Sequence, residues 1–100
     1  MGKVQLKIPP FFAYIMDPNA SDWFVLEKEI GGKTTIRDFL TELASSNSEF
    51  RDVVFNPDEA TVSDQIDIVI NQKLLDFTRE MDTKLNDGDV VILLPVYAGG

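Results

Sequence analysis

The residues best suited to chemistry are the last two of the sequence, Gly99 and Gly100. Glycine has no Cβ, so its backbone can approach a partner closely and adopt angles that other residues avoid. The four residues 97–100 span about 13–14 Å when extended, which is long enough to enter a channel while a folded domain stays outside. We therefore expect the carboxylate of Gly100 to be the reacting group and the preceding residues to present it.

An apolar run leads into this tail and must position it. Asp87-Gly88 is a turn signal, and the continuous apolar run Val90–Leu94 is typical of a central strand covered on both faces. Pro95 ends the run because it has no N–H for a ladder, and its fixed φ angle stiffens the exit of the tail. We expect the residues between the strand and the terminal carboxylate to contact the partner that receives it: Pro95, Val96, Tyr97, Ala98 and Gly99.

Composition and charge exclude several classes of site. The sequence has no cysteine and no histidine, which rules out disulfides, thiolate or imidazole metal sites and His-activated nucleophiles. The formal net charge of −8 argues against nucleic acid and anionic membranes as partners, because both bind basic surfaces. It suits a basic docking surface on another protein. Most of the excess acid lies in residues 45–89, which we interpret as a solvated surface.

The length of 100 residues and the 44% hydrophobic content predict one domain with a packed core. We expect residues 1–95 to form this domain and residues 96–100 to form a flexible tail. No secretory signal is visible, and the longest apolar runs, Ile8–Met16 and Val90–Ala98, are too short to span a bilayer. We therefore expect a cytoplasmic protein.

Two strands and a turn are predicted at the start of the chain. Apolar residues alternate with polar ones from Val4 to Ile8, and Pro9-Pro10 then ends that strand. The second strand is Trp23–Ile30, so the two form a hairpin. The aromatic residues between them, Phe11, Phe12 and Tyr14, either pack in the core or form an exposed docking patch.

One amphipathic helix follows the hairpin. Thr35 is a good N-cap, and Asp38 three residues later resembles a capping box. Apolar residues then recur at helical spacing along one face: Ile36, Phe39, Leu40, Leu43 and Ala44. We expect the helix to fray over residues 45–48.

The second half of the chain has weaker signals before its last strand. Residues 49–55 form either a helical turn or an irregular segment, and residues 56–65 are expected to be an acidic loop. Ile66–Ile70 alternates as a strand, and Leu74–Phe77 is a short strand or edge. This order predicts an α+β protein with the β-grasp fold: a mixed sheet of four to five strands, one main helix across it, and the first and last strands parallel neighbours in the middle.

At this point the sequence resembles the ubiquitin-like sulfur carriers of the MoaD/ThiS family, most of all the small subunit of molybdopterin synthase. Three stretches carry the resemblance: Gly32–Leu40 with Leu43, the strand end Ile68–Asn71, and Leu85–Pro95 followed by Gly99-Gly100. The last is similar to the family pattern L-x-d-G-D-x-V, then P-P-x-x-G-G. Val96 stands where a second proline is common, and Tyr97 where a smaller aliphatic residue is usual.

The resemblance implies a function for the tail. A ubiquitin-activating-type enzyme would use ATP to adenylate Gly100 and would then convert it to a thiocarboxylate. The sulfur would pass to a substrate held by the large subunit of molybdopterin synthase or an equivalent acceptor. The carrier itself would hold no cofactor stably and would supply no catalytic group beyond its C-terminal carboxylate.

Three functions remain open at the level of sequence. The first is a sulfur carrier for molybdopterin or for another pathway, such as thiamine synthesis or tRNA thiolation. The second is a ubiquitin-like modifier that is conjugated to lysines through Gly100, since it would need the same Gly-Gly ending. The third is a β-grasp interaction module whose last glycines have no chemical role.

Overall fold

The computed structural model describes residues 2–59, 61–63, 65–76 and 79–95. Within them, the main sheet has five strands: β1 Gly2–Ile8, β2 Phe24–Ile30, β5 Ile66–Ile70, β6 Lys73–Leu74 and β7 Val90–Pro95. Two short strands form a separate ladder: β3 Phe55–Asn56 and β4 Thr61–Val62. The helical elements are the 3-10 helix η1 Ala13–Ile15 and the α-helices α1 Ile36–Ser46 and α2 Ser48–Val53. None of the described helices is long and apolar enough to cross a membrane.

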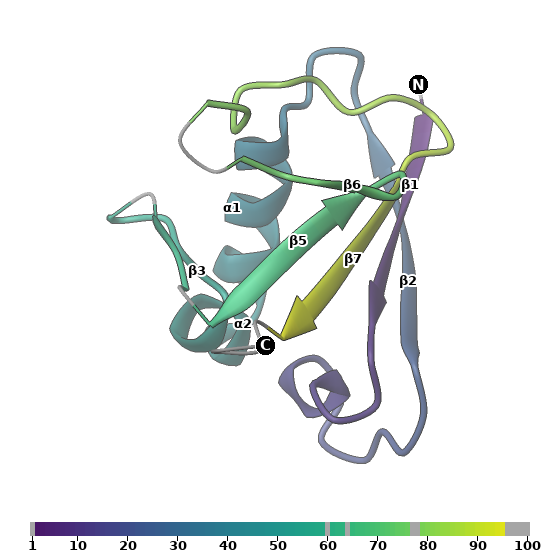
Figure 1. Ribbon diagram of the computed structural model, residues 1–100, viewed down its shortest axis with the longest axis vertical. Helices are drawn as coiled ribbons and strands as arrows, with labels where there is room; N and C mark the ends of the chain where they lie inside the picture. Colours follow the sequence, from purple (N-terminus) through teal and green to yellow (C-terminus); the bar gives the residue numbers. More distant parts are fainter. Residues whose placement is uncertain (1, 60, 64, 77–78, 96–100) are drawn as a thin grey trace.

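The main sheet has the order β2-β1-β7-β5-β6, with β1 and β7 parallel and the other neighbours antiparallel. The long helix α1 lies across one face of this sheet, and none of the described helices covers the other face (Figure 1). The predicted β-grasp fold is therefore confirmed, including the placement of the first and last strands side by side in the middle. Parallel strands need a long crossover connection. The chain between β1 and β7, which includes α1, provides it.

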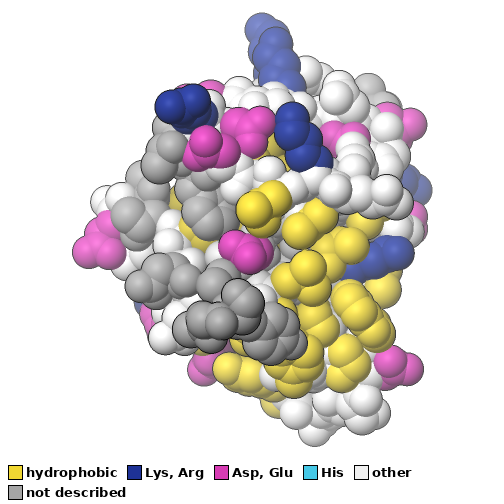
Figure 2. Space-filling model, in the orientation of Figure 1, with side chains coloured by type: hydrophobic (Ala, Val, Ile, Leu, Met, Phe, Trp, Pro, Cys, Tyr) yellow, Lys and Arg dark blue, Asp and Glu magenta, His cyan; other side chains and the backbone are white. Residues whose placement is uncertain are grey.

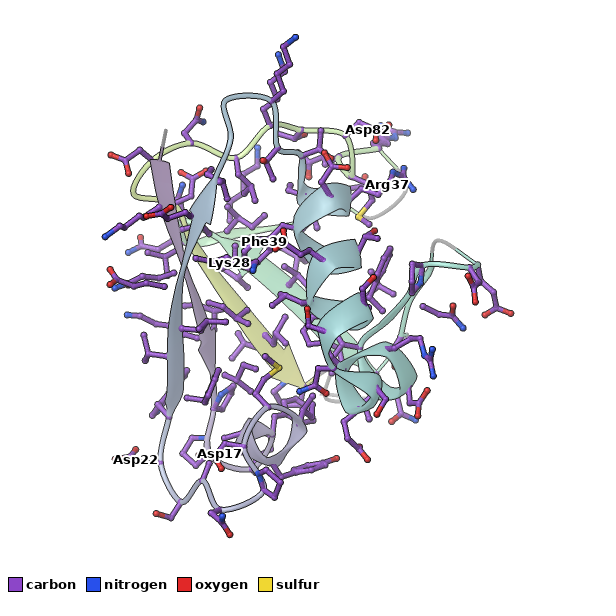
Figure 3. The ribbon with its side chains drawn as sticks, turned by 180° about the vertical axis from the view of Figure 1, so that it is seen from behind. Asp17, Asp22, Lys28, Arg37, Phe39 and Asp82 are labelled. Carbon is purple, nitrogen blue, oxygen red and sulfur yellow. The ribbon has the colours of Figure 1, made fainter. Side chains whose placement is uncertain are left out.

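Helix α1 forms where the sequence predicts it, and its apolar face builds the core. Its five apolar residues are all buried: Ile36, Phe39, Leu40, Leu43 and Ala44. Figure 3 shows Phe39 between the helix and the sheet. On the polar side, Lys28 Nζ of β2 lies 2.7 Å from Glu42 Oε1 of α1, which adds an ion pair to this packing. Such a partly exposed pair contributes less than the apolar contacts around it.

The first turn of α1 is capped both locally and by a distant segment. Thr35 Oγ1 accepts from the Asp38 N–H, and the Asp38 carboxylate accepts from the Thr35 N–H, both at 3.1 Å, so the capping box is confirmed. The Ile36 N–H donates to the Thr83 carbonyl at 3.0 Å. The segment before β7 is thereby tied to the helix.

The region after α1 differs from the prediction in two places. Residues 45–48 do not fray, because α1 continues to Ser46 and the Asn47 side chain accepts from the Phe50 N–H at 3.0 Å to cap α2. The acidic loop predicted over 56–65 was also incomplete, because Asn56 and Thr61–Val62 belong to the ladder of β3 and β4. Two-residue strands show no alternation, and for this reason they cannot be recognised in the sequence.

The start of β7 is fastened to β1 by the predicted turn. Gly88 has a φ angle of 88°, a conformation that favours glycine, and its N–H donates to the Lys3 carbonyl at 2.8 Å. Asp87 Oδ1 accepts from the Lys3 N–H at 2.9 Å. A Cβ at Gly2 would lie 2.9 Å from Asp87 Cβ, so a side chain at position 2 would push this turn away from β1. Asp87 is therefore a structural residue.

A second set of hydrogen bonds joins β7 to the turn between β5 and β6. Asn71 and Gln72 form a two-residue hairpin turn in which both φ angles are positive, 52° and 70°. The Asn71 side chain accepts from the Val90 N–H at 2.9 Å and donates to Asp89 Oδ1 at 2.8 Å. The Asn71 N–H also donates to the Val90 carbonyl at 3.0 Å. One asparagine thus fixes where β7 begins.

Replacing Asn71 should remove its side-chain hydrogen bonds to the start of β7 and lower the stability of the protein measurably. We expect Asn71→Ala to lower the free energy of unfolding by about 2–3 kcal/mol, because two side-chain hydrogen bonds are lost and because alanine tolerates a positive φ less well than asparagine does. Asn71→Gly should cost less, because it loses the same bonds without the backbone strain. Urea unfolding curves of the two variants and the wild type measure both differences. An Asn71→Ala protein as stable as the wild type would contradict the role given to this turn.

Candidate functional site

Strand β7 carries the chain toward the predicted reacting group. It is paired on both sides: with β1 through Val90–Ile92 and with β5 through 91–95, where Pro95 lies opposite Ile66. Pro95 is the last described residue of β7. Of the predicted site residues only Pro95 lies in the described part of the chain; the remaining ones, Val96, Tyr97, Ala98, Gly99 and Gly100, lie outside it.

The uncovered face of the sheet has an apolar groove next to Pro95. Its volume is about 330 Å³, and residues from β5, β7 and the β1–β2 connection line it: Pro9, Phe11, Trp23, Asp67, Val69, Leu94 and Pro95. Figure 2 views this face and shows hydrophobic side chains gathered over its lower half. The groove therefore lies at the point where the chain leaves β7.

Two aromatic side chains make the groove unusual for a solvent-facing surface. Phe11 is 56% exposed and Trp23 is 48% exposed, although both are large and apolar. Exposed aromatic residues that line a groove are typical anchors of protein interfaces. The groove is thus a candidate docking surface for whatever protein receives the tail.

The sequence left open whether three aromatic residues pack in the core or form a docking patch, and the structure divides them. Phe12 packs against the core, and its ring centroid lies 5.0 Å from that of Phe11. Phe11 and Tyr14 are exposed, and only Phe11 lines the groove. The buried residues of η1, Ala13 and Ile15, hold this segment in place.

The site offers position rather than catalytic groups. Among the described residues, every buried side chain is hydrophobic, and no group of three or more carboxylates could hold a metal ion. The two acids of the turn before β7, Asp87 and Asp89, are engaged in the backbone and side-chain hydrogen bonds described above. The turn predicted at Asp87-Gly88 is confirmed.

Reasoning from the sequence did not find the groove. Trp23, Asp67 and Leu94 come from distant parts of the chain and meet only because β7 lies between β1 and β5. The one available signal was alternation, since Leu94 and Val69 must lie on the face opposite the buried Leu93 and Ile68. Alternation predicts a shared surface only when the order of the strands in the sheet is already known.

Comparisons with known proteins agree with this fold. The ThiS family model matches residues 20–100, whereas no protein of curated function matches the sequence significantly. Among solved structures, small archaeal modifier protein 1 of Haloferax volcanii is 18% identical, with a TM-score of 0.72 over 97% of this chain and 100% of that one. A Pyrococcus furiosus protein described as molybdopterin converting factor, subunit 1, is 23% identical, with a TM-score of 0.69 over 97% of this chain and 100% of that one.

A further structural match is a chain of the BexX/CysO complex of Amycolatopsis orientalis. It is 20% identical, with a TM-score of 0.67 over 97% of this chain and 99% of that one. At these identities the structural matches establish the β-grasp fold, and the family match covers most of the sequence, including its Gly-Gly ending. The chain belongs to the ThiS family of ubiquitin-like sulfur carriers.

Proposed function

We propose that this protein carries sulfur as a C-terminal thiocarboxylate on Gly100, and that it donates this sulfur in molybdopterin biosynthesis. The observation that carries the proposal is the ThiS family match, which includes Gly99-Gly100 and β7. The likeness to the Pyrococcus furiosus protein described as molybdopterin converting factor supports this choice of pathway. The acceptor would then be the large subunit of molybdopterin synthase.

The chemistry requires activation, because a carboxylate is a poor electrophile. The carboxylate of Gly100 attacks the α-phosphate of ATP, pyrophosphate leaves, and an acyl-adenylate forms. A hydrosulfide equivalent then attacks the carbonyl carbon, the bond to AMP breaks, and a thiocarboxylate remains. The ATP and the catalytic groups belong to a ubiquitin-activating-type enzyme, and we expect the reaction in the cytoplasm. The carrier contributes a tail without side chains at its tip.

The fold supports this division of labour. Because β7 is paired on both edges, Pro95 has a fixed position on the domain, and the tail begins at a defined place. An enzyme that takes up the tail must lie against the end of β7, and therefore over the groove beside it. The net charge of −8 favours a basic surface on that enzyme.

The mass of the protein in its native cell tests the proposed thiocarboxylate. A fraction of the molecules should end at Gly100 with one oxygen replaced by sulfur, because the thiocarboxylate is the working form. Intact-mass spectrometry measures this replacement, provided that the protein is isolated under conditions in which the thiocarboxylate does not react. Material that never carries sulfur, even after incubation with ATP and the activating enzyme of the same cell, would refute the proposal.

Gly99 is expected to matter for activation and not for folding. A Gly99→Val protein should fold as the wild type does, because the residue lies beyond the last strand, but its adenylation should fall by at least about a hundredfold. The branched side chain would collide with a channel shaped for glycine. Pyrophosphate release measures activation, and urea unfolding measures stability. Full activity of the Gly99→Val protein would show that the channel does not select glycine.

A second candidate function is a protein modifier, favoured by the likeness to small archaeal modifier protein 1. The same acyl-adenylate would then react with a lysine amine, and an amide bond would replace the bond to AMP. This function predicts higher-mass conjugates in the native cell that disappear when Gly99 and Gly100 are deleted. Immunoblots of wild-type and deleted protein distinguish it, and a cell without any conjugates would exclude it.

A further inference from the structure

We propose that the groove beside Pro95 binds an arginine side chain of the activating enzyme, with its guanidinium group between the carboxylate of Asp67 and the ring of Trp23. The inference rests on the proposed function, because it names the contact by which that enzyme holds the carrier. It begins from the one charged residue in an otherwise apolar groove.

Asp67 lies on the uncovered face of the sheet, as its alternation with Ile66 and Ile68 predicts, and it is the one charged residue in the lining of the groove. It lies on β5 opposite Leu94 of β7, and it lines the groove together with Val69, Leu94 and Pro95. Its neighbours in sequence, Ile66 and Ile68, point to the opposite face and are buried. Asp67 is therefore a carboxylate among apolar side chains, and it lies on β5 beside the end of the central strand β7.

The carboxylate of Asp67 has no partner within the described part of the chain. The four ion pairs found there use other residues, and none of the side-chain hydrogen bonds involves it. Lys7 is the lysine of the uncovered face that lies closest in the sheet, one strand beyond β7, but it lines a separate hollow with Asn71 and Ile92. Asp67 is thus available to a group from outside.

A protein that covers the groove must compensate this charge. A carboxylate that is buried without a cation or hydrogen-bond donor is strongly unfavourable. A purely apolar side chain in the groove would impose that cost, whereas a cationic one would remove it. The protein's excess of acid favours a basic partner surface for the same reason.

The rest of the groove selects arginine among the cations. A guanidinium group is planar, stacks on aromatic faces and pairs with a carboxylate through two parallel hydrogen bonds. Trp23 and Phe11 offer exposed rings, while Val69, Leu94 and Pro95 offer apolar contact for the methylene stem. Lysine has the stem and the charge but lacks the planar group. The hollow of equal volume beside α2 offers no such combination, because charged and amide side chains line much of it.

A double-mutant cycle on this chain tests the shared cation. Asp67→Asn removes the charge at nearly constant shape, and Trp23→Leu removes the aromatic face but keeps an apolar residue. In ATP-dependent adenylation by the activating enzyme of the same cell, we expect Asp67→Asn to raise KM for the carrier about tenfold and Trp23→Leu to raise it several-fold, with kcat unchanged. The double variant should raise KM by less than the product of the two effects, because both act on one guanidinium group.

The matched control is Asp58→Asn, which makes the same change of net charge on an exposed residue of the loop between β3 and β4. It should leave KM within about twofold of the wild type, since distant surface charges are screened. Urea unfolding should give all four variants similar stability. The groove variants then report docking rather than folding.

Three results would overturn the inference. Asp67→Asn that behaves like Asp58→Asn would show that no cation meets the carboxylate. Independent, multiplicative effects of the two groove substitutions, or an effect of Asp67→Asn alone, would exclude a stacked guanidinium group. In each case the carrier function stands as long as the wild type is adenylated. A wild-type protein that is never adenylated would refute the proposed function, and this inference with it.

Discussion

The structure depends on the pairing of β7 along both of its edges. Its first half is held in parallel by β1, and its second half is held antiparallel by β5 as far as Pro95. A strand in this position cannot slide by one residue without turning the buried Val91 and Leu93 toward solvent. The end of the strand is therefore fixed in register, and so is the point from which the last five residues depart.

The acidic residues that precede β7 in the sequence support this pairing. Asp87, Gly88 and Asp89 set the start of β7 against Lys3 and Asn71 rather than binding a ligand. Arg37 Nε of α1 lies 3.0 Å from Asp82 Oδ1, which adds a surface contact between the helix and the segment before that turn (Figure 3). The domain is thus built to hold one strand end in place, which is what a carrier of a terminal group requires.

The two faces of the sheet have different roles. One face is sealed by α1, and the apolar side chains of the strands and the helix meet there to form the core. The other face keeps exposed aromatic residues near the end of β7, and beside them the carboxylate of Asp67, which has no partner in the described part of the chain. A partner that covered these apolar groups would lie beside Pro95, the last described residue before Gly99-Gly100 in the sequence.

The elements with a local signal could be predicted from the sequence. Helix α1 has a capping box and a complete apolar face, and β1, β5 and β7 show alternation or a continuous apolar run, so each appeared within a residue or two of its place. For residues 49–55 the sequence left a helical turn and an irregular segment open, and α2 confirms the helical turn. The β3–β4 ladder could not be predicted, because two-residue strands have no period. The groove could not be predicted either, because Trp23, Asp67 and Leu94 meet only through the strand order. The predicted tail contacts, beyond Pro95, stay predictions.

The central claim is that the carboxylate of Gly100 is the group on which the enzyme acts. The most direct test is pyrophosphate exchange into ATP by the activating enzyme, measured with the wild-type protein and with a protein that has one alanine appended after Gly100. The account predicts exchange that depends on the wild-type carrier and is abolished by the appended residue, although the fold is unchanged. Equal exchange with both proteins would contradict it, because the reacting carboxylate would then not need to follow Gly99-Gly100.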